Sequence, residues 1–338
     1  MEINDKSQHT NYTPSATRYK NMLYNRSGKS GVLLPAISIG LWHNFGFVDS
    51  LQNGREILRT AFDLGITHFD LANNYGPPYG SAEENFGIIF KKDFVPFRDE
   101  LFIASKAGYD MWPGPYGNWG SRKYLIASLD QSLKRMGLDY VDIFYHHRYD
   151  PDTPLEETMG ALADIVRQGK ALYAGISNYP AKAATEAARL LKELHVPFIL
   201  QQEKYSIFDR SIEDDVLDNI EKNETGCIVF SPLAQGMLTN KYINGIPEGS
   251  RASKNMTYLD KQQVQEEMDK IQQLAVIANK RGQKLSQMAI AWLLQKSQIT
   301  SVLIGASSST QLKENVASLD NLAFSDEELK LIEQVSKD

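Results

Sequence analysis

Residues 65–76 read Gly65-Ile66-Thr67-His68-Phe69-Asp70-Leu71-Ala72-Asn73-Asn74-Tyr75-Gly76. This stretch is a short apolar run that contains an acid and then turns into a loop carrying a tyrosine. A carboxylate buried in a strand without a partner costs several kcal/mol of folding free energy. Asp70 therefore predicts a basic partner at the same end of another strand.

Two later strand-like runs also end in polar residues. Residues 101–106 end in Lys106, and residues 141–147 end in two histidines. In an α/β barrel the carboxyl ends of the strands converge on one face, and that face carries the active site. Each polar residue alone has an ordinary explanation, such as a helix cap or a core imidazole. Their occurrence at equivalent positions of three successive strands favours a shared site.

Composition limits the class of protein. The chain has 338 residues, with 36 Lys and Arg against 42 Asp and Glu, and a formal net charge of -6. This length suits one large α/β barrel, and the mildly acidic balance argues against a nucleic-acid partner. Cys227 is the single cysteine and lies in an apolar run, which predicts a core thiol. Neither a signal peptide nor an apolar run of about 18 residues is evident, so we expect a soluble, cytoplasmic protein without a membrane partner.

The order of elements predicts the fold. Residues 1–18 form a polar arm, and residues 19–338 are expected to form a single domain that begins with a β-hairpin around a glycine turn. Eight apolar strand-like runs alternate with helical patterns after the hairpin, including one long helix over residues 262–281. Eight such units in one run predict a closed (β/α)8 TIM barrel. No G-x-G-x-x-G motif is present, so a Rossmann domain is disfavoured.

The end of the last strand resembles an anion site. Residues 301–304 are followed by Gly305 and three serines, Ser307, Ser308 and Ser309, that lead into a helix. Backbone N–H groups at such a helix start bind phosphate, although a serine run also serves as an ordinary helix cap. Gln311, Glu314 and Asn315 share one face of this helix and could hold the adenine and ribose of a dinucleotide.

Four residues together suggest a reaction. Tyrosine is a poor proton donor until a nearby cation stabilises its phenolate, and Lys106 could supply that cation to Tyr75. Asp70 would pair with Lys106, and a histidine at the end of the next strand would orient a carbonyl oxygen. A proton donor, its cation, an orienting group and a dinucleotide site are what the hydride reduction of a carbonyl requires. Strand parity alone does not choose between His146 and His147.

These residues resemble the aldo-keto reductase family over nearly the whole chain from residue 19 onward. Residues 65–76 are similar to the signature of the family's second strand, and Ser105-Lys106 to its lysine strand. The resemblance implies a catalytic tetrad of Asp70, Tyr75, Lys106 and His147, with Tyr75 as the general acid and His147 rather than His146 as the substrate orienter.

The resemblance also implies NADPH/NADP as the cofactor. It assigns the nicotinamide to Ser177, Asn178, Gln202 and the ring of Phe230, the pyrophosphate to a loop after Phe230, and the 2′-phosphate to Arg251. Ser308 departs from the family's pattern, because close relatives often carry a basic residue at that position. The complete implied set of cofactor contacts is Trp42, Ser177, Asn178, Gln202, Phe230, Ser231, Leu233, Gln235, Gly236, Lys241, Arg251, Gly305, Ser307, Gln311, Glu314 and Asn315.

Within the family, residues 108–117, 121–124 and 232–236 are similar to a branch that contains bacterial reductases of L-glyceraldehyde 3-phosphate, relatives of the potassium-channel β subunits. This similarity implies reduction of small aldehydes, among them L-glyceraldehyde 3-phosphate and methylglyoxal, by a homo-oligomer (tetramer or octamer) that needs no metal. The substrate contacts it implies are Trp42, Tyr75, Trp112, His147 and Arg148.

Two other functions fit parts of the pattern. Lys106 at a barrel strand end could be the Schiff-base lysine of an aldolase, although Asp70 and Tyr75 would then be less well explained. The chain could also be a regulatory subunit that senses NADPH and turns over slowly. Tight NADPH binding with very slow turnover would identify such a sensor.

Overall fold

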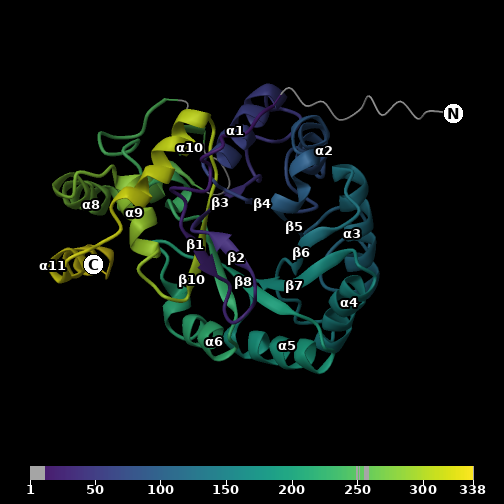
Figure 1. Cartoon of the computed structure of the whole chain (residues 1–338). Coiled ribbons are helices and arrows are strands. Elements are labelled where there is room, and N and C mark those ends of the chain that lie inside the picture. Colours follow the sequence, from purple (N-terminus) through teal and green to yellow (C-terminus); the bar gives the residue numbers. More distant parts are fainter. Residues whose placement is uncertain (1–11, 249, 251, 255–258, 338) are drawn as a thin grey trace.

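The computed structural model describes residues 12–248, 250, 252–254 and 259–337, and Arg251 therefore lies outside the described residues. Eight parallel strands close into a barrel in the order β10-β3-β4-β5-β6-β7-β8-β9, with helices around the outside (Figure 1). The predicted (β/α)8 barrel is confirmed. The barrel strands are β3 (Ile37–Gly40), β4 (His68–Asp70), β5 (Phe102–Ala107), β6 (Val141–His146), β7 (Ala171–Ser177), β8 (Phe198–Lys204), β9 (Gly226–Phe230) and β10 (Ile299–Ile304).

The helices follow local sequence signals. Helix α3 begins where the Ser121 side chain accepts a hydrogen bond from the Tyr124 backbone N–H and ends at Gly137, whose φ of 67° suits glycine. The α-helices are α1 (Leu51–Asp63), α2 (Ser81–Asp93), α3 (Arg122–Met136), α4 (Leu155–Arg167), α5 (Ala181–Glu193), α6 (Val216–Lys222), α7 (Lys261–Glu266), α8 (Met268–Lys280), α9 (Leu285–Leu293), α10 (Ser309–Val316) and α11 (Asp326–Lys337). Shorter 3₁₀ helices are η1 (Val95–Glu100), η2 (Ser211–Glu213), η3 (Ala234–Gly236), η4 (Ala252–Lys254) and η5 (Ala317–Asp320).

One predicted helix is wrong in its extent. The pattern over residues 262–281 predicts one helix, but the structure has α7 and α8, separated at Glu267. Glu267 has φ -93° and ψ 3°, outside the helical region, so the backbone breaks there even though no glycine or proline marks the position.

A hairpin closes the amino-terminal end of the barrel. Strands β1 (Tyr24–Arg26) and β2 (Leu33–Pro35) pair antiparallel, as predicted, and lie across the barrel opening in Figure 1. The Ser27 hydroxyl donates to the Ile199 carbonyl at 2.7 Å, near the start of β8. Gly28 fits because its φ is +52° and a Cβ there would lie 2.0 Å from the Glu224 carbonyl oxygen.

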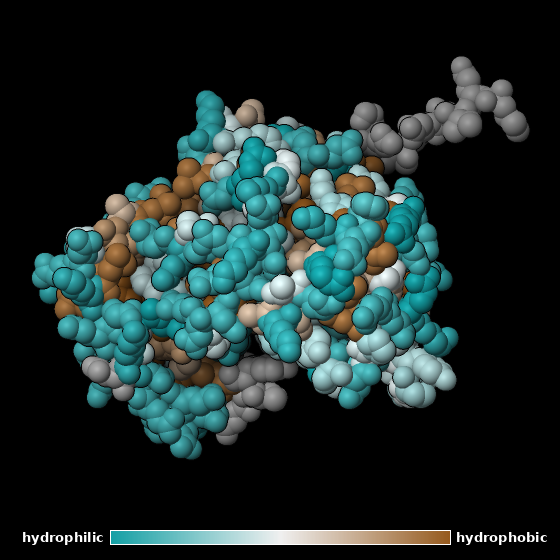
Figure 2. Space-filling model, turned by 90° about the horizontal axis from the view of Figure 1, so that it is seen from below, coloured by the Kyte–Doolittle hydropathy of each residue, from teal (hydrophilic) through white to brown (hydrophobic). Residues whose placement is uncertain are grey.

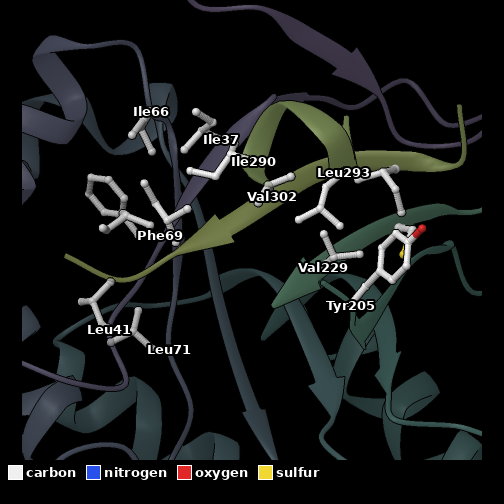
Figure 3. Packing of buried hydrophobic residues seen from close by; sticks show 14 of the residues in the cluster. Ile37, Leu41, Ile66, Phe69, Leu71, Tyr205, Val229, Ile290, Leu293 and Val302 are labelled. Atoms are coloured by element: carbon white, nitrogen blue, oxygen red, sulfur yellow. The ribbon is translucent and has the colours of Figure 1, made fainter. Parts of the chain in front are cut away.

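Apolar side chains form two layers. Inside the barrel, Leu34 of the hairpin packs with interior residues of the strands, among them Ile143 and Leu200. Between the barrel and the helices lies the larger cluster, part of which Figure 3 shows around Phe69 and Val302. Because side chains alternate along a strand, β4 packs Phe69 against α2 and directs the residues on either side of it into the barrel.

The described end of the N-terminal arm packs on the barrel. The Tyr12 hydroxyl donates to the Asp63 carboxylate at 2.9 Å, and the Tyr12 ring contacts Phe94 edge to face. Residues 1–11, the rest of the predicted arm, lie outside the described residues.

The surface face in Figure 2 is mainly hydrophilic, with smaller apolar patches between the polar side chains. Within the described ranges, every helix is too short or too polar to cross a bilayer.

Candidate active site

A buried ion pair lies at the carboxyl end of the barrel. The Lys106 ammonium donates to Asp70 Oδ2 at 2.5 Å and to the Leu71 carbonyl at 2.7 Å, and both charged side chains are fully buried. Gln202 Nε2 donates to the other Asp70 oxygen at 3.0 Å. Burial lowers the pKa of Lys106, and the Asp70 carboxylate opposes that shift. Strands β4, β5 and β8 therefore each contribute one member of a closed polar group.

Tyr75 lies above this pair. The Lys106 nitrogen is 5.1 Å from the centroid of the Tyr75 ring. The centroids of the Trp42 and Tyr75 rings are 6.3 Å apart. Burial raises the pKa of the Tyr75 phenol well above its usual value, and the Asp70 carboxylate raises it further. This differs from the expected lowering of the pKa by Lys106. The physical reason is that burial removes the water that would solvate the phenolate, and the Asp70 carboxylate repels its negative charge.

The two histidines occupy opposite sides of the strand end. The His147 ring lies 6.0 Å from the Tyr75 ring and 4.7 Å from the Tyr109 ring, centroid to centroid. Its Nδ1 atom is buried without a hydrogen-bond partner. Burial, followed by the Lys106 charge, lowers the pKa of His147 well below its usual value, so the imidazole is neutral. His146 instead contacts the Tyr179 hydroxyl at 2.5 Å, away from this group.

The loop after β5 is held by Arg148. Its guanidinium donates to the Gly108 carbonyl and to the Asn118 side chain, both at 2.8 Å, and lies 3.6 Å from the Trp119 ring centroid. Trp112, in the same loop, packs on the Tyr124 ring at 5.1 Å. The side chains of Arg148 and Trp112 therefore both make contacts with other residues in and beside the loop after β5.

Two residues near the site were not predicted. Tyr109 contacts His147, and its place directly after the lysine strand, in a loop rich in aromatics, was the signal that could have found it. Glu203 is buried behind the turn after β7, where the backbone N–H groups of Asn178 and Tyr179 face its carboxyl group. Burial raises the pKa of Glu203 to about 8. Nothing in the sequence around Glu203 indicates that environment.

The residues expected at the nicotinamide lie at adjacent strand ends. Ser177 and Gln202 are paired in register on β7 and β8, and Phe230 ends β9. Asn178 has φ 54°, in the left-handed region, and its amide donates to Ser177 Oγ at 3.0 Å and to the His147 carbonyl at 3.2 Å. The structure therefore brings these residues to the same end of the barrel as Lys106.

The loop after β9 has a strained backbone. Ser231, Ala234 and Gln235 have φ values of 56°, 45° and 59°, and Gly236 has 102°. Such conformations are uncommon for residues other than glycine and cluster at ligand sites. A cavity of about 250 Å³ adjoins Ser231 and Gln235. Leu233 is half-buried in this loop, and Lys241 lies exposed a few residues after it.

The start of α10 carries the remaining predicted contacts. A Cβ added at Gly305 would meet nothing within 4 Å, so the backbone there is open to a ligand. Gln311 Oε1 accepts from the Ser307 backbone N–H at 2.8 Å and from its hydroxyl at 3.0 Å. Asn315 is 2% exposed, yet its Nδ2 has no hydrogen-bond partner, and Glu314 pairs with Lys284 at 2.8 Å. Open backbone and an unpartnered buried amide fit a dinucleotide with its adenosine at α10.

The fold and the site define a class: a parallel barrel with a buried Asp-Lys pair, a tyrosine and a neutral histidine at its carboxyl end. A family model described as the Aldo/keto reductase family matches residues 36–337, and the chain belongs to this family of oxidoreductases. The chain is 56% identical over 322 residues to L-glyceraldehyde 3-phosphate reductase of Escherichia coli O157:H7, covering 94% of this chain and 93% of the relative. The protein of the same description from Escherichia coli strain K12 matches with the same identity and coverage.

Membership of this family of oxidoreductases argues against the aldolase alternative. In the structure Lys106 is the ion-pair partner of Asp70. Within the described ranges, no three His, Cys, Asp or Glu side chains come close enough together to hold a metal ion.

Proposed function

We propose that this aldo-keto reductase reduces L-glyceraldehyde 3-phosphate, and more slowly methylglyoxal, to the corresponding alcohols with NADPH. The observation that carries the proposal is the buried Asp70–Lys106 pair beneath Tyr75 and beside His147. The proposed substrate is the one for which the two relatives are named. The chain is proposed to work in the cytoplasm as a homo-oligomer, a tetramer or octamer, with residues 19–338 as one barrel domain.

The four residues have separate roles in the proposed reaction. The reduced nicotinamide, when bound, supplies a hydride to the carbonyl carbon. Tyr75 holds its proton because its pKa is raised, and donates it once the substrate oxygen gains negative charge. The neutral His147 orients that oxygen through a ring N–H. Lys106 stabilises the tyrosinate that remains, and Asp70 fixes the lysine in place.

The cofactor would lie along the carboxyl end of the barrel. Asn178 and Gln202 would hold the carboxamide, and Phe230 would stack on the ring. The loop after β9, with Lys241 beyond it, would hold the pyrophosphate, and Ser307 and the polar face of α10 the adenosine. Preference for NADPH over NADH rests on Arg251 as a partner of the 2′-phosphate.

The aldehyde would enter beside Trp42 and under the loop after β5. Trp42 and Trp112 would contact its carbon chain. Arg148 lies next to His147 in sequence and carries the positive charge that a substrate phosphate requires, although its guanidinium also holds the loop. We propose Arg148 as the phosphate contact.

The test is NADPH oxidation, followed by absorbance, with L-glyceraldehyde 3-phosphate, D-glyceraldehyde 3-phosphate and methylglyoxal, repeated with NADH. We expect the fastest turnover with the L-phosphate and NADPH. Tyr75→Phe should lower kcat by about 10³-fold or more, with unchanged NADPH affinity, because only the proton donor is removed. Tyr116→Phe, in the exposed part of the neighbouring loop, is the matched control and should retain its activity.

Equal activity of Tyr75→Phe and wild type would refute the role of the acid. Weak turnover of all three aldehydes, together with tight NADPH binding, would refute the proposed substrate and favour the sensor function.

A further inference from the structure

A carboxylate lies beside the start of α10. Helices α1 and α10 pack against each other (Figure 1), and the Ser309 hydroxyl donates to Glu56 Oε1 at 2.7 Å. Asn53, one turn earlier on α1, donates its amide to the Ser307 carbonyl at 3.0 Å. Helix α1 thus contributes an anion and a neutral amide to the same three-serine segment, Ser307–Ser309, that the proposed function places at the adenosine.

Among the described residues, no Lys, Arg or His side chain forms an ion pair with Glu56. Lys284, on the other side of α10, pairs with Glu314 at 2.8 Å. The two arginines of α1, Arg55 and Arg59, both pair with Asp93, at 2.6 Å and 2.7 Å. Among the residues that the structure describes, Glu56 is the one ionised side chain hydrogen-bonded to the three serines.

A carboxylate at an adenosine site distinguishes the two nicotinamide dinucleotides. Its negative charge repels the 2′-phosphate of NADPH, which needs a cation, but has little effect on the uncharged ribose hydroxyls of NADH. Serine hydroxyls and the Gln311 amide can bind either form, so they do not compensate for that repulsion. The difference between the two cofactors therefore depends on the formal charge at Glu56.

We propose that Glu56 is a specificity-determining residue of the cofactor site. It weakens the binding of the 2′-phosphate, and so narrows the preference for NADPH over NADH and allows NADH to serve as an alternative hydride donor. This inference rests on the proposed function, because it takes the adenosine to lie at Ser307 and Gln311.

The experiment measures binding rather than turnover. Dissociation constants for NADPH and NADH, and for the fragments 2′,5′-ADP and 5′-AMP, are determined by isothermal titration calorimetry for wild type, Glu56→Gln and Glu56→Lys. The two fragments differ only in the 2′-phosphate. The matched control is Glu156→Gln, which removes an equal charge at an exposed position of α4. Helix α4 lies on the other side of the barrel from α1 (Figure 1).

We expect Glu56→Gln to bind NADPH and 2′,5′-ADP about threefold to tenfold more tightly, the range for one exposed charge acting on a phosphate several Å away. Glu56→Lys should increase the affinity for NADPH and 2′,5′-ADP by more than Glu56→Gln does. Affinities for NADH and 5′-AMP should stay within about twofold, the Glu156→Gln control should match wild type, and the gain should shrink in about 0.5 M salt, because screening weakens exposed charges.

An equal change for the ligands with and without the 2′-phosphate, or no change for either, would overturn the inference while leaving the reductase activity intact. Absence of binding of both dinucleotides to wild type would instead refute the proposed function. Circular dichroism melts confirm that each variant is folded.

Discussion

The two ends of this barrel are built from the same strands but have opposite character. At the amino end, the hairpin covers the opening, Leu34 fills the interior, and Ser27 closes the contact with a hydrogen bond to the start of β8. At the carboxyl end, the same strands place Asp70 and Lys106 in the interior, fully buried, and the loops beyond adopt strained backbone conformations.

The amino end of the barrel contributes to stability, whereas the carboxyl end carries the groups proposed for catalysis. The apolar end gains free energy from the burial of hydrocarbon, about 25 cal/mol per Å² of surface removed from water. The polar end must first desolvate two charges, and it is stable because they pair with each other and with Gln202 and a backbone carbonyl. Substitutions at the carboxyl end should therefore lower both activity and stability. Substitutions at the amino end should lower stability and leave activity nearly unchanged.

The largest effect is expected from Asp70→Asn. This change leaves the Lys106 ammonium buried without a counter-charge, which destabilises a protein by about 3–5 kcal/mol. Urea unfolding followed by circular dichroism measures the loss, and kcat should fall as well because Lys106 loses its fixed position.

The matched control is Asp130→Asn, which breaks the exposed pair with Lys170. Surface ion pairs contribute about 0–1 kcal/mol to the free energy of unfolding, so the urea concentration at the midpoint of unfolding should hardly change. Equal destabilisation by the two variants would contradict the burial argument.

Leu34→Ala tests the amino end. Leu34 is fully buried in the barrel interior, so its truncation should lower the free energy of unfolding by about 2–5 kcal/mol through lost burial and the cavity left behind. The neighbouring Leu33, 51% exposed, provides the control Leu33→Ala, which should cost far less. The ratio kcat/KM should stay near the wild-type value in both variants, and its collapse in Leu34→Ala would show that the two ends are coupled.

The smallest effect per residue concerns pH. Burial lowers the pKa of His68 and of His146 to about 4, and that of His147 well below its usual value. Below pH 6.5 the unfolded chain binds protons that the native protein excludes, so stability falls as pH drops from about 6.5 towards 4. Each histidine contributes up to about 1.4 kcal/mol per pH unit.

Chemical denaturation between pH 7 and 5 measures this slope. His146→Gln should reduce the slope by about one proton, whereas His195→Asn, at an exposed position, should leave it unchanged. An unchanged slope in His146→Gln would show that this imidazole binds protons equally in the native and unfolded states, which would contradict the burial argument.

Local sequence signals predicted the architecture well, for physical reasons. Strands buried on both faces are continuous apolar runs, so the barrel could be predicted, and the ends of α3 carry local caps at Ser121 and Gly137. The break between α7 and α8 could not be predicted, because no local residue requires it.

The sequence by itself determined that an acid, a tyrosine, a lysine and a histidine stand at strand ends, since the alternation of strands and helices fixes which residues share a barrel face. Only the tertiary structure turned His147 rather than His146 towards Tyr75 and closed the Asp70–Lys106 pair. It also buried the Tyr75 phenol, which raises the pKa of that group. It also brought Glu56 to Ser309, 253 positions away in the chain. Such contacts depend on how helices pack around the barrel, and no local pattern encodes that packing.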